Sequence, residues 1–219
     1  QPQKIMIAAS GTSADGIEQF VYRVPNYYTK INLLNSLLIQ NTDWTKVLIF
    51  AATKKMADEV FEKLQVHFPN EIGIIHSNKS QNYRLRSVQN FDTGVFRLLI
   101  ATDLIARGLD FKSVSHVINI DTPEDAENYI HRVGRTARAQ EEGVAITMVN
   151  TIECTKESLY LEEIEKLMHR SIQELALPSD LSIETDLTER EQVQYQQKNA
   201  SKDIDHLKES KGAFHEKKE

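Results

Sequence analysis

Val47-Leu-Ile-Phe-Ala51 and Leu98-Leu-Ile-Ala101 decide the fold, because each is a continuous run of apolar residues. A strand that is covered on both faces has such a continuous apolar sequence, whereas a strand with one solvent-exposed face alternates apolar and polar residues. Helical patterns of ten or more residues separate the strand-like runs, which leaves room for crossover connections. The sequence therefore predicts an α/β fold with three layers, an open parallel sheet with helices on both faces.

The alternation of strands and helices extends over most of the chain. Expected strands cover Gln19–Val24, Val47–Ala51, Glu71–Ile75, Phe96–Ala101, Val114–Ile120 and Val144–Val149. Expected helices cover Tyr28–Ile39, Lys54–Phe68, Gln81–Phe91 and about Thr155–Arg170. Another helix is expected after Ile120, with Thr122 as its cap, Pro123 in its first turn and Gly134 as its stop.

Composition divides the chain into three parts. Residues 1–16 have no sustained period of either kind and are interpreted as an interdomain linker, whereas residues 17–177 carry the pattern of one α/β domain. Residues 178–219 are polar and rich in charge, so we expect a C-terminal tail that is partly helical or disordered.

Composition also disfavours several classes of protein. The sequence has no run of 18 apolar residues and no secretion signal, which predicts a cytoplasmic protein without a membrane span. The single cysteine, Cys154, is interpreted as a structural thiol, and the seven scattered histidines have no spacing suited to a metal site. A net charge of −6 argues against a basic nucleic-acid coat, so nucleic-acid binding would need individually placed residues.

Two polar segments follow strands at the edge where an open parallel sheet binds its ligands. The first is Ala101-Thr-Asp-Leu-Ile-Ala-Arg-Gly-Leu-Asp110-Phe111, which has more polar and flexible residues than folding alone explains. The second is His131-Arg-Val-Gly-Arg-Thr-Ala-Arg138, with three arginines at intervals of three. Guanidinium forks suit phosphate oxygens, so the second segment is a candidate phosphate-binding element.

These segments resemble motifs V and VI of superfamily 2 helicases, and their sequences are similar to those of the DEAD-box family of ATP-dependent RNA helicases. Leu48-Ile-Phe-Ala-Ala-Thr53 sits where that family has motif IV, and Gln81-Asn-Tyr-Arg84 matches the QxxR of motif IVa. The four matches occur in the family's order over about residues 20–150. The resemblance implies a C-terminal RecA-like domain, which has the fold of P-loop NTPases without the P-loop, and the overall wording is similar to the bacterial RhlE-like subgroup.

The resemblance also implies roles for the matching residues. Arg135 and Arg138 would be catalytic arginine fingers that face the γ-phosphate of ATP across an interdomain cleft, and Asp110 would bind the ribose hydroxyls. The residues that would couple the nucleotide side to the RNA side are His131, Arg132 and Asp103.

RNA would be bound through its sugar-phosphate backbone, whether single-stranded or duplex. The residues implied are Gln81, Arg84, Thr102, Arg107 and Gly108. Backbone contacts of this kind make binding largely independent of base sequence and sensitive to salt. The N-terminal RecA-like domain of the same protein would supply the rest of the RNA track, and the fragment alone is expected to be a monomer.

Two motifs of the family are absent from the sequence, the GxxxxGK[ST] loop and Asp-Glu-Ala-Asp; Gly11-Thr-Ser-Ala-Asp-Gly16 lacks the lysine. ATP and Mg²⁺ would therefore be bound mainly by the N-terminal domain, and we expect this fragment alone to hold no cofactor and to be inactive. The sequence also departs from the family at Ala137, where glycine is commonest, and at Ser77-Asn78, where a His-Gly-Asp-like segment is usual.

Simpler interpretations exist for several of these residues. Arg132 could pair with Glu127 or Asp125 on a solvated helix face, and Asp103 and Asp110 could be turn or cap residues. With Ser80 as a helix cap, the QxxR residues could be ordinary first-turn residues. The histidines interpreted as packing or surface residues are His67, His76 and His116.

Two other functions are compatible with the sequence. One is an RNA- or protein-binding module without turnover. The other is a DNA-directed superfamily 2 helicase, for example a RecQ-like enzyme, which shares an arginine-rich motif VI. The QxxR segment and the form of Ala101–Asp110 favour the RNA family.

Overall fold

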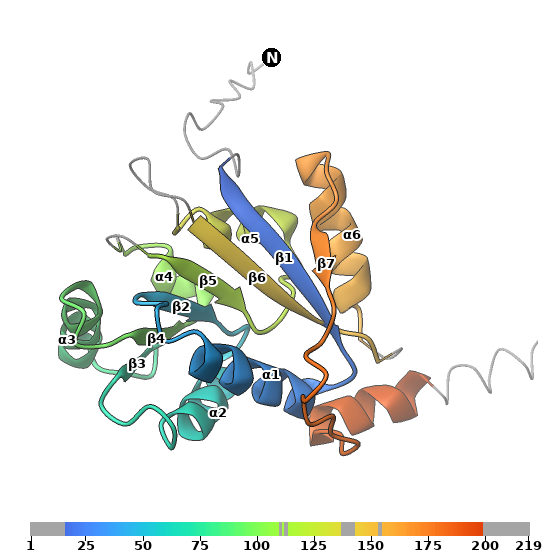
Figure 1. Ribbon diagram of the computed structural model, residues 1–219, viewed down its shortest axis with the longest axis horizontal. Coiled ribbons are helices and arrows are strands. Elements are labelled where there is room, and N and C mark those ends of the chain that lie inside the picture. Colours follow the sequence, from blue (N-terminus) through green and yellow to red (C-terminus); the bar gives the residue numbers. More distant parts are fainter. Residues whose placement is uncertain (1–15, 110, 112–113, 137–142, 153–154, 199–219) are drawn as a thin grey trace, which may run out of the picture.

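The computed structural model describes residues 16–109, 111, 114–136, 143–152 and 155–198, and its strands and helices alternate along the chain (Figure 1). The strands are β1 (Ile17–Val24), β2 (Val47–Phe50), β3 (Ile72–Ile75), β4 (Leu98–Ala101), β5 (His116–Asn119), β6 (Gly143–Asn150) and β7 (Gln173–Leu175). The helices are α1 (Tyr27–Gln40), α2 (Lys54–Leu64), α3 (Gln81–Asp92), α4 (Asp103–Ala106), α5 (Ala126–Val133) and α6 (Glu157–Met168). Within these ranges, each helix is too short or too polar to cross a membrane.

The strands form one sheet of seven in the order β3-β4-β2-β5-β6-β1-β7. All of the pairs are parallel, so the carboxyl ends of the strands meet at one edge. The two apolar runs of the sequence are the neighbours β2 and β4, with Val47 opposite Leu98 and Phe50 opposite Ala101. The predicted open parallel sheet is confirmed.

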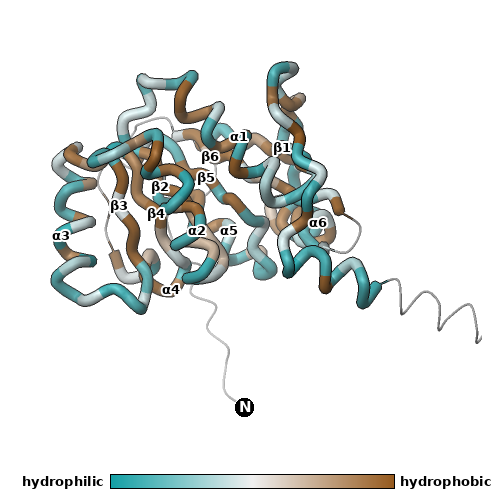
Figure 2. The backbone as a smooth tube through the Cα atoms, turned by 90° about the horizontal axis from the view of Figure 1, so that it is seen from below, coloured by the Kyte–Doolittle hydropathy of each residue, from teal (hydrophilic) through white to brown (hydrophobic). Residues whose placement is uncertain are grey.

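Helices cover both faces of the sheet, which confirms the three predicted layers. Val47 and Ile49 of β2 belong to the apolar cluster that packs under α1 and α2. Leu48 and Phe50, which alternate with them, belong to the cluster under α3, α4, α5 and α6. Figure 2 shows the apolar colour concentrated in the strands and the hydrophilic colour on outer helices such as α3.

Polar side chains cap the N-termini of α1, α2 and α3. Asn26 accepts from the backbone N–H of Thr29 at 2.8 Å, and Thr53 accepts from that of Met56 at 3.1 Å. Ser80 accepts from the N–H of Tyr83 at 3.3 Å, as expected for the start of α3. Each cap supplies an acceptor to an amide that has no partner inside its helix.

The start of α5 differs from the prediction. Asp125, not Thr122, is its cap, and its carboxylate accepts from the N–H of Glu127 at 2.9 Å. Thr122 is occupied elsewhere, since its N–H and hydroxyl lie 3.4 and 3.3 Å from Oε2 of Glu157 in α6. The predicted stop at Gly134 is confirmed, because its N–H bonds to the carbonyl of Ile130. The short elements α4 and β7 were not predicted.

The residues after Pro178 lie against the N-terminal half of α1, and we call residues 178–198 the C-terminal strap. The N–H of Glu184 donates to Oγ1 of Thr29 at 3.0 Å, and Nδ2 of Asn26 donates to the carbonyl of Glu184 at 2.5 Å. Residues 189–198 are helical and appear in dark orange beside α1 in Figure 1. This part of the expected polar tail is thus packed on the domain.

Glu191 joins the strap to the body of the domain. Its Oε1 accepts from the N–H of Tyr27 at 2.8 Å and from Nδ2 of Asn150 at 2.7 Å. Its Oε2 accepts from the N–H of Thr188 at 2.9 Å, and its own N–H donates to Oγ1 of Thr188 at 3.2 Å. The second pair of bonds is a capping box, so one buried carboxylate both starts the strap helix and satisfies the start of α1.

Replacing Glu191 with alanine is expected to lower the free energy of unfolding by about 2–3 kcal/mol, because buried donors of Tyr27 and Asn150 lose their acceptor. Urea denaturation of the chain measures this change. Glu189→Ala removes the same charge from an exposed position on the same helix and is the matched control. Equal midpoints for the two variants would contradict the expectation.

Candidate functional site

The predicted functional segments gather at the carboxyl edge of the sheet. Ala51 donates its N–H to the carbonyl of Ala101 at 3.0 Å, and Ile120 donates to the carbonyl of Phe50 at 3.1 Å. The N–H of Thr102 lies 3.4 Å from the carbonyl of Ile75. The chain segments that leave β3, β4, β2 and β5 therefore start side by side, as expected of an edge that binds ligands.

Arg132 lies at the centre of this edge with only 2% of its surface exposed. Its Nε and Nη2 form a fork on Asp103, at 2.7 and 2.8 Å. Its Nη1 donates to Oδ1 of Asn119 at 3.3 Å and to the carbonyl of Asp121 at 3.1 Å, and Nη2 also reaches Oδ2 of Asp121 at 3.3 Å. The guanidinium carbon lies 5.2 Å from the ring centroid of Phe50. All five donors of the guanidinium thus have acceptors.

The interpretation of Arg132 as a solvated partner of Glu127 or Asp125 is wrong. Side chains of a helix point back toward its N-terminus, so a residue in the last turn of α5 reaches over the edge of the sheet. Asp103 is not the cap of α4 either, since Thr102 holds that position and Asp103 lies in the first turn. Arg132 therefore ties the segment after β4 to the segment after β5.

For both Arg132 and Asp121, burial and the charge of the partner side chain have opposite effects on the pKa. Burial raises the pKa of Asp121, and the positive charge of Arg132 offsets only part of that rise. Burial alone would lower the pKa of Arg132, but Asp121 and Asp103 together raise it. Oδ1 of Asp121 also accepts from the N–H of Ala52 at 2.7 Å. The segment after β2 is thereby included in the same network.

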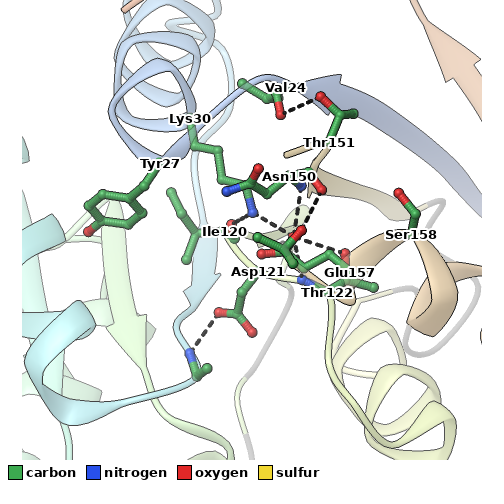
Figure 3. Close-up of polar contacts among 12 residues, drawn as sticks. Val24, Tyr27, Lys30, Ile120, Asp121, Thr122, Asn150, Thr151, Glu157 and Ser158 are labelled. Atoms are coloured by element: carbon green, nitrogen blue, oxygen red, sulfur yellow. Dashed lines mark hydrogen bonds and ion pairs between the residues drawn. The ribbon is translucent and has the colours of Figure 1, made fainter. Parts of the chain in front are cut away.

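A second buried network lies beside the first and is centred on Glu157 (Figure 3). Its Oε2 accepts from Nζ of Lys30 at 2.6 Å and from the N–H of Asn150 at 2.9 Å. Nζ of Lys30 also donates to the carbonyl of Ile120 at 2.9 Å. This network joins α1, β5, β6 and α6, so it fixes the outer part of the same edge.

A cleft of about 1190 Å³ opens above the two networks, between α1, α2 and the C-terminal strap. Asp103, Asp121 and Arg132 are among its lining residues, which links it to the edge described above. Other lining residues include Tyr27, Thr53, Lys55, Glu157, Tyr160 and Arg190. Within the described ranges, no group of histidine, cysteine and carboxylate side chains is arranged to hold a metal ion.

Arg135 follows the end of α5 and is half-buried. Its Nη1 donates to the carbonyl of Leu109 at 2.9 Å, and burial lowers the pKa of its guanidinium. The contact places Arg135 beside the segment that leads to Asp110. Asp110 and Arg138 lie outside the described residues, whereas His131 is exposed on the last turn of α5.

The residues implied in RNA binding fall into two places. Ile75 and Ala101 are directly opposite each other in the sheet, so the path to Gln81 and Arg84 starts beside Thr102. Arg107 and Gly108 are exposed at the C-terminal end of α4, whereas Thr102 lies at its N-terminal end.

Thr102 is buried and makes no capping bond with its side chain, whereas Gln81 is exposed in the first turn of α3. Nε of Arg84 is buried without a hydrogen-bond partner among the described residues. Ser80 caps α3. This cap is expected whether Gln81 and Arg84 bind RNA or are ordinary residues of the first turn, so it does not distinguish the two interpretations.

His76, which the sequence indicates as a packing or surface residue, lies directly after β3. The ring is buried, and both of its nitrogens have partners, Asp58 and the N–H of Asn78. In the sequence, His76 follows a buried strand and opens the segment where the family usually has His-Gly-Asp, just before the QxxR segment.

The chain matches the family model described as helicase conserved C-terminal domain over residues 29–140. It is 35% identical over 173 residues to the ATP-dependent RNA helicase RhlB of Shewanella piezotolerans, covering 78% of this chain and 38% of that protein. It is 34% identical to the RNA helicase CrhR of Synechocystis, covering 88% of this chain and 38% of that protein. The chain thus spans about two fifths of the length of these relatives. Assignment to the RhlE-like subgroup stays a prediction.

Solved structures of DEAD-box proteins have the same architecture. The E. coli DEAD-box protein SrmB, bound to regulator of ribonuclease activity A, superposes with a TM-score of 0.69 at 29% identity, covering 78% of this chain and 97% of that one. The C-terminal domain of the DEAD-box protein Dbp5 gives 0.66 at 32% identity, covering 74% and 91%. Domain 2 of Mss116p bound to an RNA duplex gives 0.65 at 29% identity, covering 74% and 65%. The chain therefore belongs to the helicase conserved C-terminal domain family and is a RecA-like C-terminal domain of the DEAD-box type.

Proposed function

We propose that the whole protein is an ATP-dependent RNA helicase, in which this domain forms half of the nucleotide cleft and half of the RNA track. The observation that carries the proposal is the fork of Arg132 on Asp103. Arg132 belongs to the arginine-rich segment, and Asp103 follows Thr102 in the segment proposed to bind RNA. This ion pair, buried on the side of Arg132, holds the two segments together, and RNA-dependent hydrolysis needs such a link.

On the nucleotide side, we assign Arg135 and Arg138 as arginine fingers and Asp110 as the acceptor for the ribose. Transfer of the γ-phosphoryl group spreads negative charge over its oxygens, which fixed guanidinium groups stabilise. The bond from Arg135 to the carbonyl of Leu109 supports the assignment, because Leu109 is the residue that precedes Asp110 in the sequence. ATP and Mg²⁺ would be held mainly by an N-terminal RecA-like domain of the whole protein.

On the RNA side, we assign Gln81, Arg84, Thr102, Arg107 and Gly108 to contacts with phosphates and sugars. The pairing of β3 with β4 supports a shared surface for the first three. The buried Nε of Arg84 adds support, because an unpaired buried donor is rare and requires an explanation. An RNA phosphate supplies the missing acceptor if the guanidinium turns outward on binding.

The relatives that share this domain are named as RNA helicases, and domain 2 of Mss116p, which has the same fold, was solved bound to an RNA duplex. The partners we propose are therefore RNA and the N-terminal domain of the same protein. We also propose that the protein acts in the cytoplasm and that this domain alone is a monomer.

ATP hydrolysis by the full-length protein tests the proposed function. Single-stranded RNA is expected to raise the rate at least about tenfold more than DNA of the same sequence, a difference of about 1.4 kcal/mol. The 219-residue chain alone is expected to show no turnover. Equal stimulation by DNA would favour a DNA-directed helicase, and RNA binding without hydrolysis would favour a binding module.

A further inference from the structure

The turn of residues 76–80, between β3 and α3, is held against α2 by side-chain contacts. Nε2 of the buried His76 lies 3.0 Å from Oδ1 of Asp58, and Nδ1 accepts from the N–H of Asn78 at 3.3 Å. With Nδ1 accepting, Nε2 carries the proton and donates to the carboxylate. One ring thus connects helix α2 to the backbone of the turn.

Asp58 holds a second point of the same turn. Nζ of Lys79 lies 2.9 Å from the Oδ1 atom that also receives His76. Burial would raise the pKa of Asp58, but the bonds from Lys79 and His76 lower it, so the carboxylate is held in its charged form. Nζ of Lys54 donates to Oδ1 of Asn78 at 3.0 Å and adds a third point. The turn is therefore anchored to α2 at His76, Asn78 and Lys79.

This turn delivers the residues that we assign to RNA. It starts at the end of β3, where Ile75 lies opposite Ala101 and thus beside Thr102. It ends at Ser80, the cap of α3, which is followed at once by Gln81. The placement of Gln81 relative to Thr102 therefore depends on the conformation of these five residues.

We propose that Asp58 and His76 are positioning residues for RNA, which set the place of Gln81 and Arg84 relative to Thr102. The proposal rests on the proposed function. The side chain of Asp58 is 41% exposed, and ion pairs at such positions add little to stability. Binding residues, in contrast, must be held within about 0.5 Å of their working geometry by supporting contacts. The contact to Asp58 is therefore expected to affect RNA binding more than folding.

The test uses Asp58→Ala in the full-length protein with a fluorescent single-stranded oligoribonucleotide. Anisotropy gives the Kd for RNA, and ATP hydrolysis gives kcat at saturating RNA and KM for ATP. We expect the Kd for RNA to rise about fivefold to tenfold, which corresponds to a loss of about 1 kcal/mol in the free energy of RNA binding. The kcat and the KM for ATP are expected to change less than about twofold. Removing an acid by itself strengthens binding of a polyanion, so weaker binding has the opposite sign from a simple charge effect.

Two further variants complete the test. Glu62→Ala removes the same charge from an exposed position on the same helix and is expected to bind RNA at least as tightly as the wild type. Asp58→Asn retains an acceptor for His76 and is expected to recover most of the affinity. A Kd for Asp58→Ala equal to that of Glu62→Ala would overturn the positioning role while leaving the proposed function intact. A wild-type protein that neither binds RNA nor hydrolyses ATP would overturn both.

Discussion

Arg132→Ala is expected to lower the free energy of unfolding by about 3–5 kcal/mol. This is a large part of the total free energy of unfolding of an ordinary domain, about 5–15 kcal/mol. Arg132 supplies all five donors of its guanidinium to Asp103, Asn119 and Asp121. Its removal leaves two carboxylates close together, one of them fully buried, without their cation. The cost arises from these uncompensated charges more than from the lost attraction.

Urea denaturation of the chain measures this effect, with Arg107→Ala as a control that removes an exposed arginine. Arg132→Lys keeps the charge but not the planar fork, so it is expected to recover only part of the stability. Adding Asp103→Asn to Arg132→Ala removes one unpaired charge and is expected to restore part of the loss. A loss below about 1 kcal/mol for Arg132→Ala would be typical of a surface ion pair and would contradict the network described.

Arg138→Ala in the full-length protein is expected to reduce the kcat of RNA-stimulated ATP hydrolysis by roughly 10³–10⁵. A finger acts on charge that develops in the transition state, so the Kd values for ATP and RNA are expected to change little. Arg135→Ala is expected to act in the same direction, since the bond to Leu109 holds that guanidinium in place for the same task.

Steady-state hydrolysis at saturating RNA, with separate binding titrations, measures the effect of Arg138→Ala. Lys166→Ala removes an exposed cation from α6 and is the control for a change of charge alone. Turnover of Arg138→Ala near the wild-type rate would exclude Arg138 as a finger. Loss of ATP binding along with hydrolysis would assign Arg138 to ground-state binding instead.

The strands of the sheet were predictable because their signal is local. Val47 to Phe50 and Leu98 to Ala101 are apolar at every position, and only burial on both faces explains such runs. The edge strand β7 (Gln173–Leu175) has no such signal. Its strand conformation comes from pairing with Phe20–Tyr22 of β1, more than a hundred residues away, which no local pattern records.

The site was predictable only in part, for the same reason. Position after a strand marked Thr102 and Asp103, but nothing local shows that Arg132 reaches both Asp103 and Asp121. Thr122 was predicted as a cap, but its hydroxyl donates to Glu157, which lies on a later helix. For Arg132 and Thr122, contacts with residues distant in the sequence decided against the local expectation.

The place of β1 in the sheet has a consequence for biosynthesis. Among the strands of this domain β1 is made before the others, but its neighbours are β6 and β7, and Ile17 pairs with Gly143. At 5–20 residues per second, the first strand waits roughly 6–25 s for its partner to be made. During that time its apolar residues, such as Val21 and Val24, have no sheet to join. β1 therefore stays without its partner strand until most of this domain has been made, and an unpaired apolar strand of this kind is prone to aggregate.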